Sequence, residues 1–320
     1  LWSFVVGGAL INACGVAGAN FHTLTGNMNT GKIIWGILHA VAGIILVRLG
    51  GFQLFEKLMA VSIGLMFTTV IITAIAIKPD WGQVFKGLLI PSIPDQSLKW
   101  VLGLLGGVGG TVTVLSYGYW ITEKNRKGMA GLKESRIDLT VAYGLTGVFS
   151  IAMIIIAGNL SSFDTKGIHL AVAIGNELDN TLGTWSKWCF LTGFWGAVFS
   201  SLLGVWQSVP YLFADFITMR KGAVKTGKLE TTPAYQYYLL GLGLIPIISL
   251  WMTFETIQVT YAVTGAFFMP ILATTLLILN NKIKFVGKEF RNTPILNILL
   301  VLTLLFFAFA GFWKLKGILL

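Results

Sequence analysis

The sequence predicts an all-α membrane protein whose chain crosses the bilayer several times. Only 11% of its 320 residues are charged, 55% are apolar, and the mean hydropathy is +0.78. A soluble domain of this length carries about a quarter charged residues to cover its surface. Together with the presence of only two cysteines, this composition excludes an ordinary globular domain, a disordered chain and a disulfide scaffold.

Nine stretches that contain no Asp, Glu, Lys or Arg predict the membrane-spanning helices. They are residues 1–31, 33–47, 58–77, 100–122, 139–163, 188–214, 231–254, 256–281 and 292–312. A membrane helix needs about 20 mostly apolar residues, and only the second stretch is too short. It spans the bilayer if Lys32 and Arg48 extend to the two interfaces. Transmembrane β-strands are excluded because the stretches are too long and do not alternate polar with apolar residues.

The basic residues predict the orientation of the chain. Of the 23 Lys and Arg residues, 15 lie in every second loop, namely 48–57, 123–138, 215–230 and 282–291. Such loops face the cytoplasm, so the chain enters the membrane from the inside. The net charge of +10 is therefore a topology signal with some attraction for lipid headgroups, and nucleic acid is not expected as a partner. We expect a multi-pass protein of the cell membrane.

The fourth stretch contains glycines crowded near the middle of the membrane, at positions 103, 106, 107, 109 and 110. Each interior glycine costs a helix about 1 kcal/mol relative to alanine, so unwinding is easy there. Thr111 and Thr113 add hydroxyl oxygens beside the carbonyls that unwinding would free. Close helix packing through Gly103 and Gly107 is the alternative. The central position favours a broken helix, which is how secondary transporters build cation sites.

The sixth stretch supplies a second polar cluster around Gln207, which either bridges two helices or lines a cavity. Pro210 donates no amide hydrogen, so the carbonyl of Trp206 loses its helical partner. We expect Asp215 to form an interfacial ion pair with Arg220 or Lys221. His22 and His39 are expected to be packing or interface residues. Residues 164–187 are expected to form an external surface helix followed by a loop, with Glu177, Asp179 and Asn180 in water.

Three motifs resemble the Nramp-type divalent metal transporters. The segment from Asn280 to Asn297 is similar to the connection between that family's tenth and eleventh helices, with Gly-Lys-Glu-Phe at 287–290. The Ser-Ser-Leu-Leu-Gly-Val-Trp-Gln run at 200–207 resembles the eighth helix, and residues 103–111 resemble the broken sixth helix. The resemblance implies that the nine stretches match helices three to eleven of an inverted-repeat, LeuT-like transporter fold.

This register also implies a division of the chain. Residues 1–97 form the remainder of the first repeat, residues 98–280 form the second repeat, and residues 281–320 form an extra C-terminal helix. The family's Asp-Pro-Gly motif of the first helix has no counterpart here. We therefore expect a chain that lacks two N-terminal helices and does not transport by itself.

The chain departs from the family at the sixth-helix break, where the resemblance places a metal-binding Met. Gly110, Thr111 and Val112 stand there instead, uncertain by one residue. The family's carbonyl ligand falls at Gly107, or at Gly106 in the other register, with Gly109, Thr113 and Gln207 as further candidates. Carbonyl and hydroxyl oxygens suit hard cations, whereas a thioether suits transition metals. The resemblance is therefore greatest to the Nramp-related magnesium transporters, with a divalent cation as substrate and no cofactor.

The departures also argue against proton coupling. The sixth-helix His of the family is absent, and residues 1–20 and 235–253 hold no charge. A proton relay needs a chain of titratable groups, so we expect uncoupled uptake of Mg²⁺, Mn²⁺ or Fe²⁺ by alternating access. The alternatives are a Na⁺-coupled symporter of amino acids or other organic solutes with the same fold and, more distantly, a membrane-embedded enzyme. An enzyme needs paired catalytic groups at one depth, which the stretches do not supply.

Overall fold

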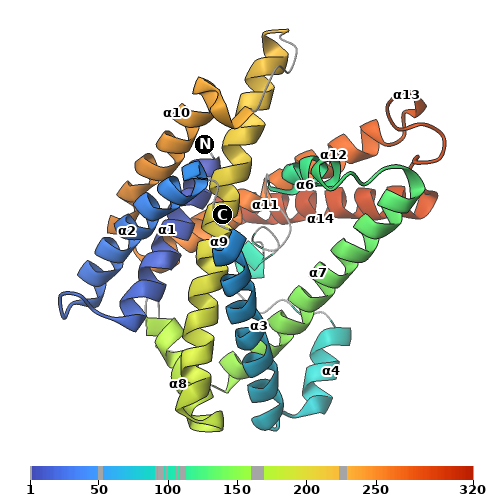
Figure 1. Ribbon diagram of the computed structural model, residues 1–320. Coiled ribbons are helices and arrows are strands. Elements are labelled where there is room, and N and C mark those ends of the chain that lie inside the picture. The colour runs from blue at the N-terminus through green and yellow to red at the C-terminus, as the bar shows by residue number, and fades with distance from the viewer. Residues whose placement is uncertain are drawn as a thin grey trace. The chain divides into compact units, whose positions relative to one another are not determined.

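The computed structural model is built from helices (Figure 1), and among the residues that it describes seven helices are long and apolar enough to cross a membrane. It describes residues 2–49, 53–90, 92, 97, 100–101, 103–104, 107, 113–159, 169–222 and 229–319. The seven lie at Trp2–Phe21, Met28–Leu49, Met59–Ala76, Gly128–Gly158, Thr184–Arg220, Pro233–Trp251 and Phe254–Leu279. A shorter apolar helix covers Pro294–Phe309. The prediction of a polytopic all-α protein is confirmed.

The helices follow one another along the chain with short connections. They are α1 (Trp2–Phe21), α2 (Met28–Leu49), α3 (Gln53–Ala76), α4 (Trp81–Leu89), α6 (Thr113–Glu123), α7 (Gly128–Gly158), α8 (Leu170–Leu182), α9 (Thr184–Arg220), the 3₁₀ helix η2 (Leu229–Thr231), α10 (Pro233–Leu244), the 3₁₀ helix η3 (Ile245–Trp251), α11 (Phe254–Ala266), α12 (Phe268–Leu279), α13 (Ile283–Val286) and α14 (Pro294–Leu319).

Eight of the nine predicted spans correspond to helices. The short second stretch is the 22-residue helix α2, which includes Lys32 and Arg48 as expected. The eighth stretch is interrupted at Phe267, between α11 and α12. The first half of the fourth stretch falls largely outside the described residues, and its second half is α6. The count of nine is therefore approximate.

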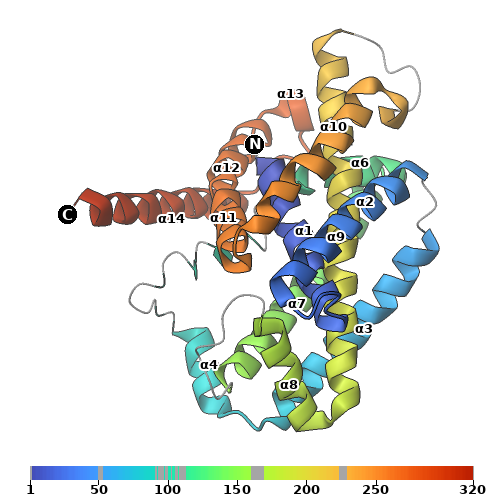
Figure 2. The same ribbon diagram turned by 90° about the vertical axis from the view of Figure 1, so that its left-hand side faces the viewer.

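The chain divides into two units. The first consists of Leu1 and residues 3–91 and 115–258, and it is organised around α9. Helices α2, α3, α8 and α10 all pack on α9, and α7 packs on α3. Figure 2 shows α9 running between these helices. Because α9 has 37 residues, different helices contact its two ends.

Two apolar clusters hold this unit together. Helices α3, α7, α8 and α9 contribute the nine buried residues of the first cluster, which are Met66, Val70, Ala74, Ala152, Ile156, Ile174, Leu178, Phe190 and Leu191. The second cluster surrounds the fully buried Trp206 of α9. A Cβ on Gly43 of α2 would lie 2.7 Å from the Trp206 ring, so only glycine lets α2 approach this closely.

Two helices lie outside the apolar stretches. The helix predicted within residues 164–187 is present as α8, but the loop predicted after it is not, because α8 ends at Gly183 with φ of 93° and α9 begins at Thr184. The sequence analysis missed α4, which is nine residues long and begins at an Asp80 side chain that accepts from the Gln83 amide. Asp80 could have predicted this helix from the sequence, because an aspartate before a short amphipathic segment is typical of a helix start.

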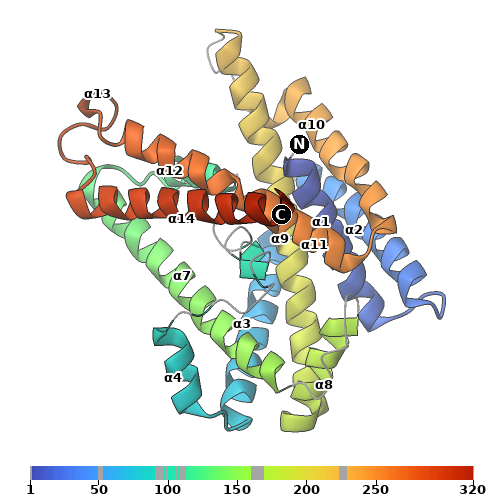
Figure 3. The same cartoon turned by 180° about the vertical axis from the view of Figure 1, so that it is seen from behind.

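The second unit consists of Trp2 and residues 92–114 and 259–320, and its helices α12 and α14 pack side by side (Figure 3). Amide side chains fix the connection between them. Asn281 and Asn297 exchange two hydrogen bonds, of 2.8 and 3.0 Å, and Asn292 donates a third to Asn297 at 2.9 Å. The asparagine entering the last helix, which the sequence analysis singled out, therefore closes the turn.

Candidate functional site

The glycine-rich segment lies mostly outside the described residues. This applies to four of the predicted site residues, Gly106, Gly109, Gly110 and Thr111. Gly107 is described as helical and exposed, and a Cβ there would have open space. A Cβ on Gly103 would meet Ala262 of α11 at 3.5 Å, an ordinary packing contact. Gly103 thus lies beside a neighbouring helix, as close packing requires, whereas Gly107 faces no neighbour among the described residues.

Thr113, another predicted site residue, is the first residue of α6. The described part of this helix runs from Thr113 to Glu123. The predicted break between Gly107 and Thr113 stays a prediction, because the residues between them are not described.

Gln207 lies on α9, and its side chain is exposed in this chain. Its backbone carbonyl is 3.5 Å from the Tyr235 hydroxyl of α10. Helix α9 continues through Pro210 to Arg220, so the missing proline amide does not end it. Gln207 is exposed whereas Asp215, eight residues later on α9, is buried, so the structure does not bring these two side chains together. Gln207 and Gly107 belong to different units.

Asp215 is buried near the end of α9, with 3% of its surface exposed, while Arg220 and Lys221 are exposed. Its Oδ2 accepts a hydrogen bond from the Tyr119 hydroxyl of α6 at 2.5 Å. The Tyr119 ring also meets the Tyr211 ring edge-on, at 5.1 Å between centroids. The sequence predicted a basic partner for Asp215, and the tyrosine partner was missed because no local pattern brings α6 to α9.

Neutral polar side chains join α1 to η3 and α11. The Asn12 amide of α1 donates to the Gly8 carbonyl, and at 3.0 Å it also reaches the carbonyl and the hydroxyl of Ser249 in η3. The Gln258 amide of α11 donates to the Ala9 carbonyl at 2.8 Å. These residues were not singled out from the sequence, although a polar residue inside an apolar stretch is a usable signal.

His39 is a packing residue, as expected. Its Nδ1 lies 2.7 Å from the Trp35 carbonyl, and its Nε2 lies 2.7 Å from the Trp195 indole nitrogen. The carbonyl can only accept and the indole can only donate, so Nδ1 carries the proton and the imidazole is neutral. Phe199 packs edge-on against the ring, at 4.9 Å between centroids. Neither hydrogen-bond partner titrates.

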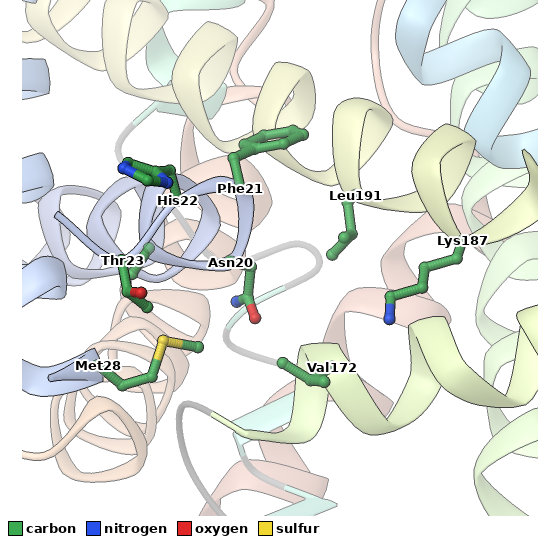
Figure 4. Close-up of a pocket in the computed structure, with 9 residues that line it drawn as sticks. Asn20, Phe21, His22, Thr23, Met28, Val172, Lys187 and Leu191 are labelled. Carbon is green, nitrogen blue, oxygen red and sulfur yellow. The ribbon is translucent and has the colours of Figure 1, made fainter. Parts of the chain in front are cut away.

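A cavity of about 280 Å³ lies where the end of α1 meets α2, α8 and α9 (Figure 4). Its lining includes Asn20, Met28 and Lys187, and the Lys187 ammonium donates to Asn176 of α8 at 2.8 Å. None of the predicted site residues lines it. Because the lining carries an ammonium and no carboxylate, this cavity is a poor place for a metal cation.

Metal ligands of the usual kind do not cluster within the described ranges, where no three His, Cys, Asp or Glu side chains meet.

Comparison with known proteins supplies the family. Residues 2–315 match the family model described as natural resistance-associated macrophage protein-like, or Nramp. The chain is also 24% identical over 231 residues to the divalent metal cation transporter MntH of Caldanaerobacter subterraneus subsp. tengcongensis. This alignment covers 70% of the chain and 52% of the relative, so the chain spans about half the length of that protein.

Proposed function

The chain belongs to the Nramp family, and from this premise we propose that it moves divalent metal cations across a membrane by alternating access. The observation that carries the proposal is the family match over residues 2–315, with the name of the MntH relative in support. Nramp proteins are transporters rather than enzymes and need no cofactor, since the metal is the substrate. The membrane-enzyme alternative is therefore set aside.

The preferred substrate in this proposal is a hard divalent cation, Mg²⁺ or Mn²⁺. At the predicted break of the fourth span, the chain offers the carbonyls of Gly106 and Gly107 and the hydroxyl of Thr111. Gly110 stands where the family resemblance implies a methionine sulfur. A site made of oxygen ligands and retained water discriminates against softer transition metals.

Uptake without proton coupling is the second part of the proposal. The charge-free α1 meets η3 and α11 through Asn12, Ser249 and Gln258, none of which titrates. His39 is held neutral between Trp35 and Trp195. A proton relay needs successive titratable groups within reach of one another, and these contacts support its absence along α1.

The test is uptake by the full-length protein in proteoliposomes, with Mg²⁺, Mn²⁺, Ca²⁺ or Na⁺ outside and a pH dye inside. We expect Mg²⁺ and Mn²⁺ to enter in response to an inside-negative potential with no acidification of the lumen. Acidification in proportion to metal entry would contradict uncoupled transport. Failure to carry any divalent cation, or a Na⁺-dependent uptake of amino acids, would reject the metal transporter itself.

The substrate preference has its own variant. Gly110→Met introduces the sulfur at the predicted break, and we expect it to shift the ratio of Mn²⁺ to Mg²⁺ uptake toward Mn²⁺. Gly144→Met is the matched control, because Gly144 of α7 is exposed and a Cβ there meets nothing. An unchanged ratio in both Gly110→Met and Gly109→Met, with Gly144→Met as reference, would count against the oxygen site.

A further inference from the structure

Two rows of polar side chains, one on α6 and one on α9, meet near the end of α9. On α9, Ser208, Tyr211 and Asp215 follow each other at three and four residues, so their side chains lie on one face. On α6, Ser116 and Tyr119 share a face in the same way. Tyr119 brings the rows together, since its hydroxyl donates to Asp215 and its ring contacts Tyr211.

The two serine hydroxyls in these rows are buried and lack a hydrogen-bond partner. Ser116 is 2% exposed and Ser208 is 7% exposed, and neither Oγ has a partner within the residues that the structure describes. Helical hydroxyls elsewhere in the chain donate to the carbonyl one turn earlier, as Ser135 does to Gly131 and Ser150 does to Thr146. Because a buried unpaired hydroxyl is costly, these two oxygens are suited to a ligand.

The chemistry of this cluster is that of a hard cation site. Its centre is the buried carboxylate of Asp215 with the phenol of Tyr119. Ser208 lies seven residues before Asp215, about 10.5 Å along the helix, so the two serine hydroxyls would act through water ligands of the cation. Mg²⁺ and Mn²⁺ accept oxygen ligands of this kind, and Mg²⁺ usually keeps several waters beside one or two carboxylates. Asp215 is 3% exposed, and burying a carboxylate is costly. A cation beside it would offset that cost.

The position of the cluster gives it a place in transport. Asp215 lies eight residues beyond Gln207 on α9, which is about 12 Å of helix toward the predicted cytoplasmic loop 215–230. The cluster therefore lies next to the predicted cytoplasmic loop, the side on which an imported cation is released.

We propose that Asp215, Tyr119, Ser116 and Ser208 form a second, inner cation site that receives the divalent metal before its release into the cytoplasm. The inference rests on the proposed transport function. It makes Asp215 a metal ligand rather than an interfacial ion-pair residue.

The test uses Mn²⁺ and the full-length protein, measuring bound Mn²⁺ per protein by equilibrium dialysis and Mn²⁺ uptake in proteoliposomes. Asp215→Asn is expected to bind one Mn²⁺ fewer and to lower the maximal uptake rate about tenfold. The external concentration for half-maximal uptake should change less than about twofold, because the outer site is untouched. Asp215→Glu should recover much of the uptake rate. Tyr119→Phe should lower the affinity for the second Mn²⁺ while preserving the ring contact with Tyr211.

Asp138→Asn is the matched control. Asp138 accepts from the Tyr117 hydroxyl at 2.9 Å near the cytoplasmic end of α7, so it repeats the Asp–Tyr pair, but its side chain is 43% exposed and it also pairs with Arg126. We expect this variant to bind and transport Mn²⁺ like the unmodified protein.

Each other outcome is informative. If a folded Asp215→Asn protein binds as many Mn²⁺ ions as the unmodified protein, the inner site is overturned even if transport slows. The Tyr119–Asp215 hydrogen bond would then only hold α6 against α9. If that variant does not fold, the double variant Ser116→Ala/Ser208→Ala decides, and unaltered affinity for the second Mn²⁺ overturns the proposal. An unmodified protein that neither binds nor carries Mn²⁺ would instead reject the proposed function.

Discussion

At the residue scale, Asn12 of α1 contacts the 3₁₀ helix η3 at the end of the predicted span 231–254. A 3₁₀ run of seven residues is unusually long, since such runs rarely exceed about four. The Asn12 amide reaches the backbone and hydroxyl oxygens of Ser249, and Lys32 donates to the Met252 carbonyl at the end of η3. These side chains supply donors to carbonyls that an ordinary α-helix would satisfy internally.

Asn12→Leu should therefore destabilise the protein. The leucine cannot donate to the Ser249 carbonyl or hydroxyl, so that carbonyl keeps only the Met252 amide as donor and the hydrogen bonds from α1 to η3 are lost, at a cost of about 1–3 kcal/mol. The measurement is thermal unfolding of the purified full-length protein in detergent. Asn20→Leu is the control on the same helix, because the Asn20 amide donates only to Val16, one turn earlier, within the part of the chain described. Equal melting temperatures for the two variants would show that the contact with Ser249 does not stabilise η3.

The residues that the sequence could predict are those whose signal is local. Gln207 and His39 stood out because each is polar within an apolar stretch, and the structure places His39 as a packing residue. The pairing of Asp215 with Tyr119 was beyond reach, because the two residues are 96 positions apart and meet only through packing. Sequence reasoning instead chose the nearest basic residues, which are exposed.

At the element scale, glycines on α9 determine how closely other helices approach. A Cβ on Gly193 would lie 2.6 Å from the Ser62 carbonyl oxygen of α3 and would overlap the Met66 side chain. Helices α3 and α9 have the most extensive contact in the first unit. Their packing thus depends on a missing side chain, as in other small-residue interfaces between membrane helices.

Gly193→Ala should push α3 away from α9 and destabilise the unit by about 1–3 kcal/mol, since overpacking a tight contact is costly. Gly204→Ala is the control on the same helix. A Cβ at Gly204 meets nothing within 4 Å, so this variant measures only the effect of alanine on helix stability. That change should be neutral or stabilising by up to about 1 kcal/mol. Thermal unfolding of both proteins decides, and a Gly193→Ala protein as stable as Gly204→Ala would refute the close contact.

The elements themselves were largely predictable. Long uncharged stretches identify membrane helices because burying charge in lipid is costly, and eight of the nine stretches correspond to helices. The breaks within them were harder to place. The interruption at Phe267 and the 3₁₀ geometry of η3 depend on local backbone adjustment that apolar composition does not encode. Helix α4 was missed because nine amphipathic residues carry little signal.

At the scale of the whole molecule, charge distribution decides orientation. The prediction that residues 1–97, 98–280 and 281–320 divide the chain into repeat portions and an extra helix stays a prediction, because it depends on the family register. The orientation is a prediction as well, and it rests on the 15 basic residues in alternate loops. Arg126 in one of these loops donates a hydrogen bond to Asp138, and this bond raises the pKa of the Arg126 guanidinium. Arg126 therefore keeps its positive charge at any physiological pH.

The orientation can be tested on either side of α9, which crosses the membrane once between Asn180 of α8 and Lys221. Both residues are exposed, so a cysteine at either position should react readily. In a full-length background without native cysteines, Asn180→Cys should react with a membrane-impermeant maleimide on intact cells. Lys221→Cys should react only after permeabilisation, because cytoplasmic loops retain the basic residues. The reverse pattern would invert the molecule and place the Asp215 end of α9 outside, which would make the inner cation site an entry site.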